Sequence, residues 1–139
     1  MQGLPESATA FLTHLKSRAR ELRRTIVFPE GSDSRVIAAA LRLQQEGVAE
    51  PVLITSTPQA NLRCIDPANS ELARKYASMY HERRRAKGIT EIEAADITRK
   101  PLYFGALMVA AGDAHGCVAG AANTTSHVVR AALHCVGTA

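Results

Sequence analysis

Residues 116–133 read GCVAGAANTTSHVVRAAL. The apolar run at 117–119 predicts a short strand, and Gly120 with the small residues after it predicts a tight turn. From Val128 onward, apolar residues recur at the spacing of one helix face. A strand that passes through a tight turn into a helix is typical of α/β proteins.

The turn of this unit is a candidate anion site. The first backbone N–H groups of a helix have no partners within the helix, and the helix dipole is positive at that end. The hydroxyls of Thr124, Thr125 and Ser126 and the guanidinium of Arg130 supply further donors beside it. The alternative is that a hydroxyl here only caps the helix, which is the commoner role of Thr or Ser in this place.

The earlier part of the chain has a similar order of elements. Residues 25–28 (TIVF) predict a buried strand, and Asp33 or Ser34 can cap the helix that follows. That helix is expected to end at Gly47, and residues 52–54 predict a second strand. A strand, a helix and a strand within about thirty residues have the size of a βαβ unit, which joins parallel strands through a right-handed crossover.

Further helices are expected on both sides of this unit. Their expected positions are residues 7–24, residues 71–87, a helix that opens with the capping box Thr90–Glu93, and a deeply buried helix at 102–111. Residues 58–69 are ambiguous between a short helical piece and a short strand at 64–65. The alternation of strands and helices predicts an α/β fold of three layers, α/β/α, around a mostly parallel sheet.

Two turns are expected at the same edge of this sheet. Ligands of parallel sheets bind beyond the carboxyl ends of the strands, and the turns at 29–35 and 120–130 both fall there. Each turn contains hydroxyls and is followed by an arginine a few residues into the next helix. We therefore expect Arg35 and Arg130 to reach into one shared cleft.

The composition fits one domain with a packed core. The chain has 139 residues, of which 46% are hydrophobic and 4% aromatic, so Ala, Val, Ile and Leu must build most of the core. The net charge of +4 fits anionic small molecules. Three widely spaced cysteines indicate free thiols in a reducing compartment. Because the sequence shows neither a secretion signal nor a membrane span, we expect a cytoplasmic protein.

Several well-known sites lack their sequence signatures. No GxGxxG follows the first strand, no GxxxxGK[ST] occurs, and no Ser/His/Asp triad can be assigned. The five histidines lack metal-ligand spacing, so no metal site is expected, and only His115 and His127 lie near the candidate turn. Residues 83–85 (RRR) suit the negative end of a helix dipole. A nucleic-acid interface built on them is disfavoured by the small net charge and the few aromatics.

Three longer stretches carry a family resemblance. They read IVFPEGSDSRVIAAA, HERRRAKGITEIEAADI and PLYFGALMVAAGDAHGCVAGAANTTSHVVRAAL, and with the spacing between them they cover nearly all of residues 11–137. In these stretches the chain resembles the N-terminal part of the phosphate acetyl/butyryl transferases, and the acetyl branch, the phosphate acetyltransferases, fits better. The resemblance implies a two-domain α/β fold similar to isocitrate and isopropylmalate dehydrogenases, with the site in the interdomain cleft, and a homodimer.

The same resemblance implies a reaction and a set of binding residues. The reaction is acetyl-CoA + phosphate = acetyl phosphate + CoA, in which the CoA thiol attacks the acetyl phosphate carbonyl directly. No cofactor is implied, since CoA is a substrate. The family's positions for recognising CoA and phosphate match Arg35, Arg84 and Arg130, and its hydroxyl pair at the phosphate-side turn matches Thr124 and Thr125.

Two features depart from the family pattern. His115 and His127 stand where the family often has an acid. The family's second domain and C-terminal segment, with the Ser-Arg pair and the aspartate that carry catalysis, match nothing in this sequence. We therefore expect residues 1–139 to be an N-terminal α/β domain that is incomplete, has no catalytic residue and no turnover of its own, and leaves an apolar patch along the last helix. The alternative is a non-catalytic CoA- or phosphate-binding or regulatory domain of the same fold.

Overall fold

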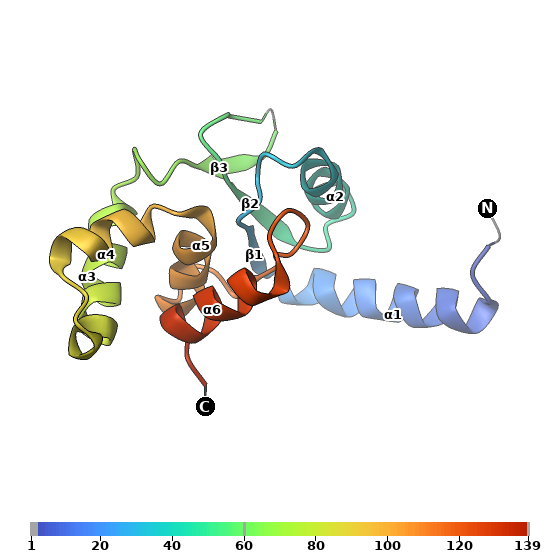
Figure 1. Ribbon diagram of the computed structural model, residues 1–139. Coiled ribbons are helices and arrows are strands. Elements are labelled where there is room, and N and C mark those ends of the chain that lie inside the picture. The colour runs from blue at the N-terminus through green and yellow to red at the C-terminus, as the bar shows by residue number, and fades with distance from the viewer. Residues whose placement is uncertain (1–2, 60, 139) are drawn as a thin grey trace.

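The computed structural model describes residues 3–59 and 61–138. A sheet of four parallel strands lies at the centre of the fold (Figure 1). The strands are β1 (Thr25–Phe28), β2 (Glu50–Ile54), β3 (Arg63–Ile65) and β4 (Gly116–Cys117), in the spatial order β3-β2-β1-β4. β1 pairs in parallel with both β2 and β4, and Val27 lies between Val52 and Cys117 in the register. The parallel sheet predicted from the sequence is confirmed.

Helices connect these strands and follow them. They are α1 (Glu6–Leu22), α2 (Ser34–Gln45), α3 (Leu72–Arg84) with the 3-10 turn η1 (Arg85–Lys87), α4 (Glu91–Thr98), α5 (Pro101–Ala110) and α6 (Thr125–Cys135). The Asp33 carboxylate caps α2 by accepting the backbone N–H of Arg35, and Thr90 and Glu93 form the predicted capping box of α4. Within the described part of the chain, no helix combines the length and apolar character that a membrane span needs.

The two faces of the sheet are covered by different helices. Successive side chains of a strand point to opposite faces. Phe28 and Leu53 accordingly pack with Ala40 of α2, whereas Val27 and Val52 belong to the cluster around α5. Helices α3, α4 and α6 pack around α5 on that side. The predicted three-layer α/β/α arrangement is confirmed.

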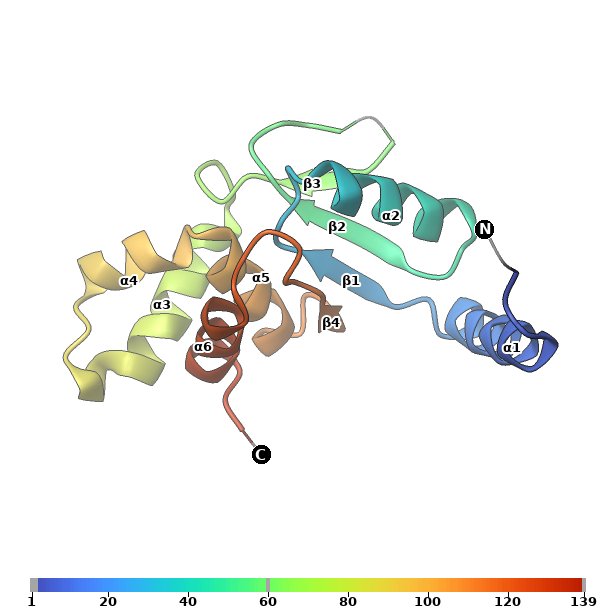
Figure 2. The same ribbon diagram turned by 45° about the vertical axis from the view of Figure 1, so that its right-hand side comes forward.

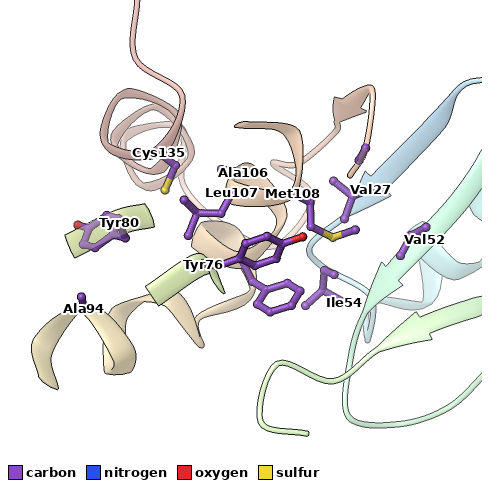
Figure 3. Packing of buried hydrophobic residues seen from close by; sticks show 12 residues of the cluster. Val27, Val52, Ile54, Tyr76, Tyr80, Ala94, Ala106, Leu107, Met108 and Cys135 are labelled. Carbon is purple, nitrogen blue, oxygen red and sulfur yellow. The ribbon is translucent and has the colours of Figure 1, made fainter. Parts of the chain in front are cut away.

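The larger core forms around α5. Phe104 and Met108 of this helix are fully buried, as expected for a helix that is apolar nearly all round. The ring of Tyr76 meets that of Phe104 edge to face, with centroids 4.9 Å apart. Figure 3 shows Met108 and Tyr76 lying between Val27 of the sheet and Tyr80 of α3, so one continuous core joins the sheet to the outer helices.

Helix α1 differs from the other helices because none of its residues is buried. Figures 1 and 2 show it extending away from the sheet. Lys16 Nζ donates to the Glu46 carboxylate at 3.3 Å, and Arg20 Nε donates to the Glu46 backbone carbonyl at 2.7 Å. Phe11 and Leu15, on the predicted apolar side, are 61% and 46% exposed. The pattern thus predicted the helix correctly, but no other described residue covers its apolar side.

Some element ends differ from the sequence-based prediction. The strand predicted at 117–119 is regular only at Gly116–Cys117, because the chain then bends into the loop before α6. The helix predicted at 71–87 ends as an α-helix at Arg84 and tightens into η1 before Gly88, whose φ of 87° is left-handed. In the described part of 58–69, the regular element is β3 rather than a helix. The helix predicted at 7–24 begins at Glu6, after Pro5, and ends at Leu22.

Candidate functional site

A cavity of about 670 Å³ lies at the carboxyl ends of the central strands. It is lined by residues 29–33 after β1, 54–56 at the end of β2, 66–68 after β3, 99–103 at the start of α5, and Ala122, Asn123, His127 and Arg130 from the loop and helix after β4. The walls thus come from every connection that leaves the carboxyl edge of the sheet. This is the edge at which ligands of parallel sheets bind.

Positive charge gathers in this cavity. Arg99, Lys100 and Arg130 line it, and none of them forms an ion pair with a carboxylate of the described residues. The acids of the lining already have partners: Asp33 pairs with an arginine of α2 at 2.8 Å, and Asp66 accepts the amide N–H bonds of the two residues after Pro67 at 3.0 and 2.7 Å. The acids of the lining, Glu30 included, are thus held by protein donors, whereas the three cations have no carboxylate partner among the described residues and can bind an anionic ligand.

The loop that was expected to hold an anion already holds one of the protein's own. The buried carboxylate of Glu30 accepts the backbone N–H groups of Gly120, Ala121, Ala122 and Asn123 at 2.7, 2.9, 2.5 and 2.7 Å. It also accepts the side-chain amide of Asn123 at 3.0 Å. Burial works to raise the pKa of Glu30, but these hydrogen bonds together outweigh it and lower the pKa. Glu30 is therefore an ionised group within a cradle of N–H donors.

Arg35 lies on the other side of this loop. Its guanidinium donates to both carboxylate oxygens of Asp33, at 3.1 and 2.8 Å, and to the backbone carbonyl of Ala121 at 2.6 Å. The hydrogen bonds from Arg35 lower the pKa of Asp33 to about 2. Arg35 lines a smaller cavity of about 270 Å³ together with Glu30 and Ala121, and not the larger one. The structure thus does not bring Arg35 and Arg130 into one cavity.

The start of α6 shows the capping role, one of the two roles that the sequence left open. Thr124 is the N-cap, and its hydroxyl accepts the backbone N–H of His127 at 3.4 Å. The same hydroxyl lies 3.1 Å from that of Ser126. Thr124 and Thr125 are both exposed, and Arg130 in the second turn reaches the cavity. The capping interpretation therefore holds for Thr124, and its surroundings remain open to a ligand.

Arg84 lies at the end of α3, away from the lining of the cavity. Its Nε is buried without a hydrogen-bond partner among the described residues, and so is Nδ1 of His134. Burial, followed by the charges of Arg84 and Arg130, lowers the pKa of His134. The same two charges oppose the rise that burial causes in the pKa of Tyr103. Arg84 and Arg130 therefore act on the same pair of side chains, between α3, α5 and α6.

The two histidines singled out from the sequence have different places. His127 lines the cavity. His115 instead accepts the backbone N–H of Thr25 on its Nδ1 at 2.9 Å, where β1 begins, and it lies outside the cavity lining. Closeness to the candidate turn in the sequence thus predicted a place in the cavity lining correctly for His127 and wrongly for His115.

Sequence reasoning missed several residues of the cavity. Arg99 and Lys100 reach the cavity from the connection between α4 and α5. The hydroxyls of Ser32 and Thr55 lie 2.9 Å apart where β1 and β2 end. A usable signal existed: polar residues directly after neighbouring parallel strands meet at one edge. Glu30 gave no comparable signal, because its partners are backbone groups about ninety residues away.

The sequence profile of the phosphate acetyl/butaryl transferase family matches residues 10–139. The chain belongs to this family. Among curated proteins it is similar to the phosphate acetyltransferase of Acetivibrio thermocellus, with 37% identity over 140 residues that cover 94% of this chain and 42% of the relative. It is also 37% identical to the phosphate acetyltransferase of Synechocystis sp., over 92% of this chain and 20% of the relative.

Solved structures of phosphate acetyltransferases show the same fold. The EutD phosphotransacetylase from Staphylococcus aureus matches with a TM-score of 0.84 and 34% identity, over 94% of this chain and 43% of that one. A phosphotransacetylase from Streptococcus pyogenes matches with a TM-score of 0.84 and 30% identity, over 91% and 42%. The chain thus spans less than half the length of these relatives, and it corresponds to their N-terminal portion.

Residues 3–59 and 61–138 contain no group of three or more His, Cys, Asp or Glu side chains placed to hold a metal ion. The three cysteines are free thiols, and burial raises the pKa of the fully buried Cys135 to about 12. The Cys135 thiol is therefore not prepared to act as a nucleophile near neutral pH.

Proposed function

We propose that the chain supplies the N-terminal, substrate-binding part of an enzyme that transfers acetyl between CoA and phosphate, acetyl-CoA + phosphate = acetyl phosphate + CoA. The observation that carries this proposal is the cavity at the carboxyl edge of the sheet, in which Arg99, Lys100 and Arg130 have no carboxylate partner among the described residues. Membership in the phosphate acetyl/butaryl transferase family supports the choice of reaction. Both substrates carry phosphate groups, which such cations bind through charge-assisted hydrogen bonds.

Each residue then has a stated role. Arg130, at the mouth of the cavity, would bind a phosphate group of CoA or the free phosphate, and Thr124 and Thr125 would add hydroxyl donors at the start of α6. Arg84, beside the same Tyr103 and His134 as Arg130, would bind a second phosphate of CoA. Arg35 was expected in this set as well, but its guanidinium is already bonded to Asp33 and Ala121, so direct contact would require these bonds to open.

The chemistry requires more than binding. Attack of the CoA thiol on the acetyl carbonyl needs the two substrates held in line, a base for the thiol and positive charge for the departing phosphate. The described residues offer the positive charge, and we assign no base and no other catalytic residue among them. We therefore propose that this chain alone binds CoA and phosphate without turning them over. We further propose that the reaction uses CoA as a substrate and no cofactor, and that the protein is cytoplasmic and assembles as a homodimer. A purely regulatory domain is less favoured, because the relatives are named for the reaction.

Calorimetric titration of CoA, and separately of phosphate, into the purified chain tests the proposal. Arg130→Ala should weaken binding by about tenfold or more, since a hydrogen bond to a charged group is worth about 1.5–3 kcal/mol. Arg74→Ala, which removes an exposed arginine of α3 outside the cavity, is the matched control and should leave binding unchanged. Equal effects of the two variants, or binding that excess duplex DNA abolishes, would contradict the proposal, and so would acetyl phosphate formation by this chain alone.

A further inference from the structure

We infer that Glu30 and Arg35 are positioning residues that together clamp the loop 120–123. By holding this loop they set the direction of α6 and the position of Arg130. The Glu30 carboxylate also occupies the backbone N–H groups of the loop, so the phosphate of the substrate binds elsewhere in the cavity. Only the last part of this inference rests on the proposed function. The clamp itself is a property of the unliganded chain.

The first half of the clamp consists of the backbone N–H donors of the loop, and all four of them are bound by Glu30. Four consecutive backbone N–H groups, from Gly120 to Asn123, all point at the two oxygens of Glu30. Successive N–H groups that converge in this way form an anion-binding nest. In this chain the nest is filled from within, by a carboxylate at the end of β1 that is only 8% exposed. A phosphate could use these donors only by displacing the Glu30 carboxylate and breaking its hydrogen bonds to the loop.

The second half of the clamp is a hydrogen bond from Arg35 to a carbonyl acceptor of the loop. Its guanidinium bridges the Asp33 carboxylate, which caps α2, and the carbonyl of Ala121 in the middle of the loop. Glu30 therefore accepts hydrogen bonds from the N–H groups of the loop, while Arg35 donates one to a carbonyl of the loop. Glu30 lies just after β1 and Arg35 lies in the first turn of α2, so both come from a part of the chain about ninety residues before the loop. Two contacts of opposite polarity leave the loop little freedom to turn.

The loop in turn orients α6. Asn123 is the last residue held by Glu30, and Thr124, the next one, is the N-cap of α6. Ala122 and Asn123 line the larger cavity with Arg130, whereas Ala121 lines the smaller cavity with Arg35. The clamped loop is thus the wall between the two cavities. A shift of the loop would move the Arg130 guanidinium relative to Arg99 and Lys100.

A spectroscopic titration of the wild-type chain tests the first half of the clamp without any variant. Amide NMR signals of residues 120–123 are followed without ligand as the pH falls from about 7 to about 3. We expect the four signals to move together, with one apparent pKa below the ordinary value of a glutamate. In Glu30→Gln, whose amide side chain does not titrate, this common transition should disappear. Four amides that titrate separately, or not at all, in the wild type would overturn the clamp.

Hydrogen exchange of the same amides tests the second half of the clamp. Arg35→Lys keeps the charge but lacks the planar fork whose two nitrogens reach both Asp33 oxygens and Ala121, so exchange at 120–123 should quicken by about tenfold, as in Arg35→Ala. Arg42→Ala, another exposed arginine of α2, is the control and should leave these rates unchanged. Unchanged exchange in both Arg35 variants, together with a loss of phosphate affinity, would make Arg35 a direct ligand and overturn its positioning role.

Addition of inorganic phosphate at neutral pH separates this inference from the proposed function. We expect the side-chain signals of Arg130 and His127 to move while the amides of 120–123 keep their positions. Movement of those amides as large as that of Arg130 would place phosphate in the nest and overturn the inference. If phosphate moves no signal, the proposed function fails for this chain, and the clamp is then judged by the titration and the exchange rates alone.

Discussion

Tyr76 donates its hydroxyl to the Asp113 carboxylate at 2.6 Å, and this bond joins α3 to the turn between α5 and β4. Tyr76 is fully buried, and burial together with the bond to Asp113 raises the pKa of its phenol, so that it remains a donor. Lys75 Nζ donates to the same carboxylate oxygen at 2.9 Å from a more exposed position. One carboxylate thus receives a buried neutral donor and a surface cation.

Tyr76→Phe should destabilise the chain more than loss of the lysine does. The variant removes a buried hydrogen bond to a charged group while keeping the ring that packs on Phe104, and the expected cost is about 1.5–3 kcal/mol. Lys75→Met removes an ion pair at the surface, where the expected cost is below about 1 kcal/mol. Urea unfolding of the two variants checks the order. A larger loss in Lys75→Met would show that the surface charge, and not the buried hydroxyl, holds the turn.

The stability of the chain should fall in acid through Glu30 and Asp113. Hydrogen bonds lower the pKa of both carboxyls in the folded state, against burial in each case. A carboxyl whose folded pKa is depressed stabilises the fold above its unfolded pKa, and this contribution is lost as the pH falls through the folded pKa. Urea midpoints should therefore drop between about pH 5 and about pH 3.

The variant Glu30→Gln should flatten this acid dependence, because the amide side chain does not titrate. Glu21→Gln removes an exposed carboxylate of α1 that forms no ion pair among the described residues, and it serves as the control. The control should keep the full wild-type drop. A Glu30→Gln chain that loses as much stability in acid as the wild type would show that other groups cause the drop.

The fold could be predicted from the sequence because its strongest signals are local. The apolar run at 25–28, the helix end at the left-handed Gly47 and the capping box at Thr90 each depend on a few neighbouring residues. The order of strands and helices then leaves few topologies for a parallel sheet. The apolar side of α1 shows the limit of such reasoning, since periodicity predicts a helix with an apolar face and says nothing about what covers it.

The candidate site could be predicted only in part, because its decisive contacts are long-range. The position of Arg130 at the carboxyl edge of the sheet followed from the strand, turn and helix pattern. That the nearby N–H groups are taken by Glu30, and that Arg35 holds Ala121, depends on two segments meeting in space. A glutamate after a strand has many possible partners, and a single sequence does not distinguish among them.

Gly31→Ala should be costly because the residue after Glu30 lies against the backbone of β2. A Cβ at Gly31 would lie 2.6 Å from the carbonyl oxygen of Ile54, which cannot move without distorting the strand. We expect a loss of about 1–3 kcal/mol in urea unfolding, as for other overpacked sites. Gly116→Ala is the matched control, since its Cβ would meet only the end of the Ile26 side chain at 3.2 Å. Similar losses in the two variants would mean that the loop after β1 yields to a methyl group.

The outer face of α6 should cause the purified chain to self-associate. Val129, Leu133 and Val136 are 49%, 50% and 45% exposed, and their spacing of four and three residues places them on one face of the helix or its end. Exposed apolar groups that gather on one face favour association, whereas a single one is normal. Leu133→Lys should therefore lower the average mass in sedimentation velocity, and Ile92→Lys, which alters an exposed residue of α4, should not. Leu15→Lys reports on the other exposed apolar side, that of α1. If Leu15→Lys alone dissociates the protein, association proceeds through α1 and not through α6. A wild-type chain that is monomeric at every concentration would show that neither the α6 face nor the α1 side causes association.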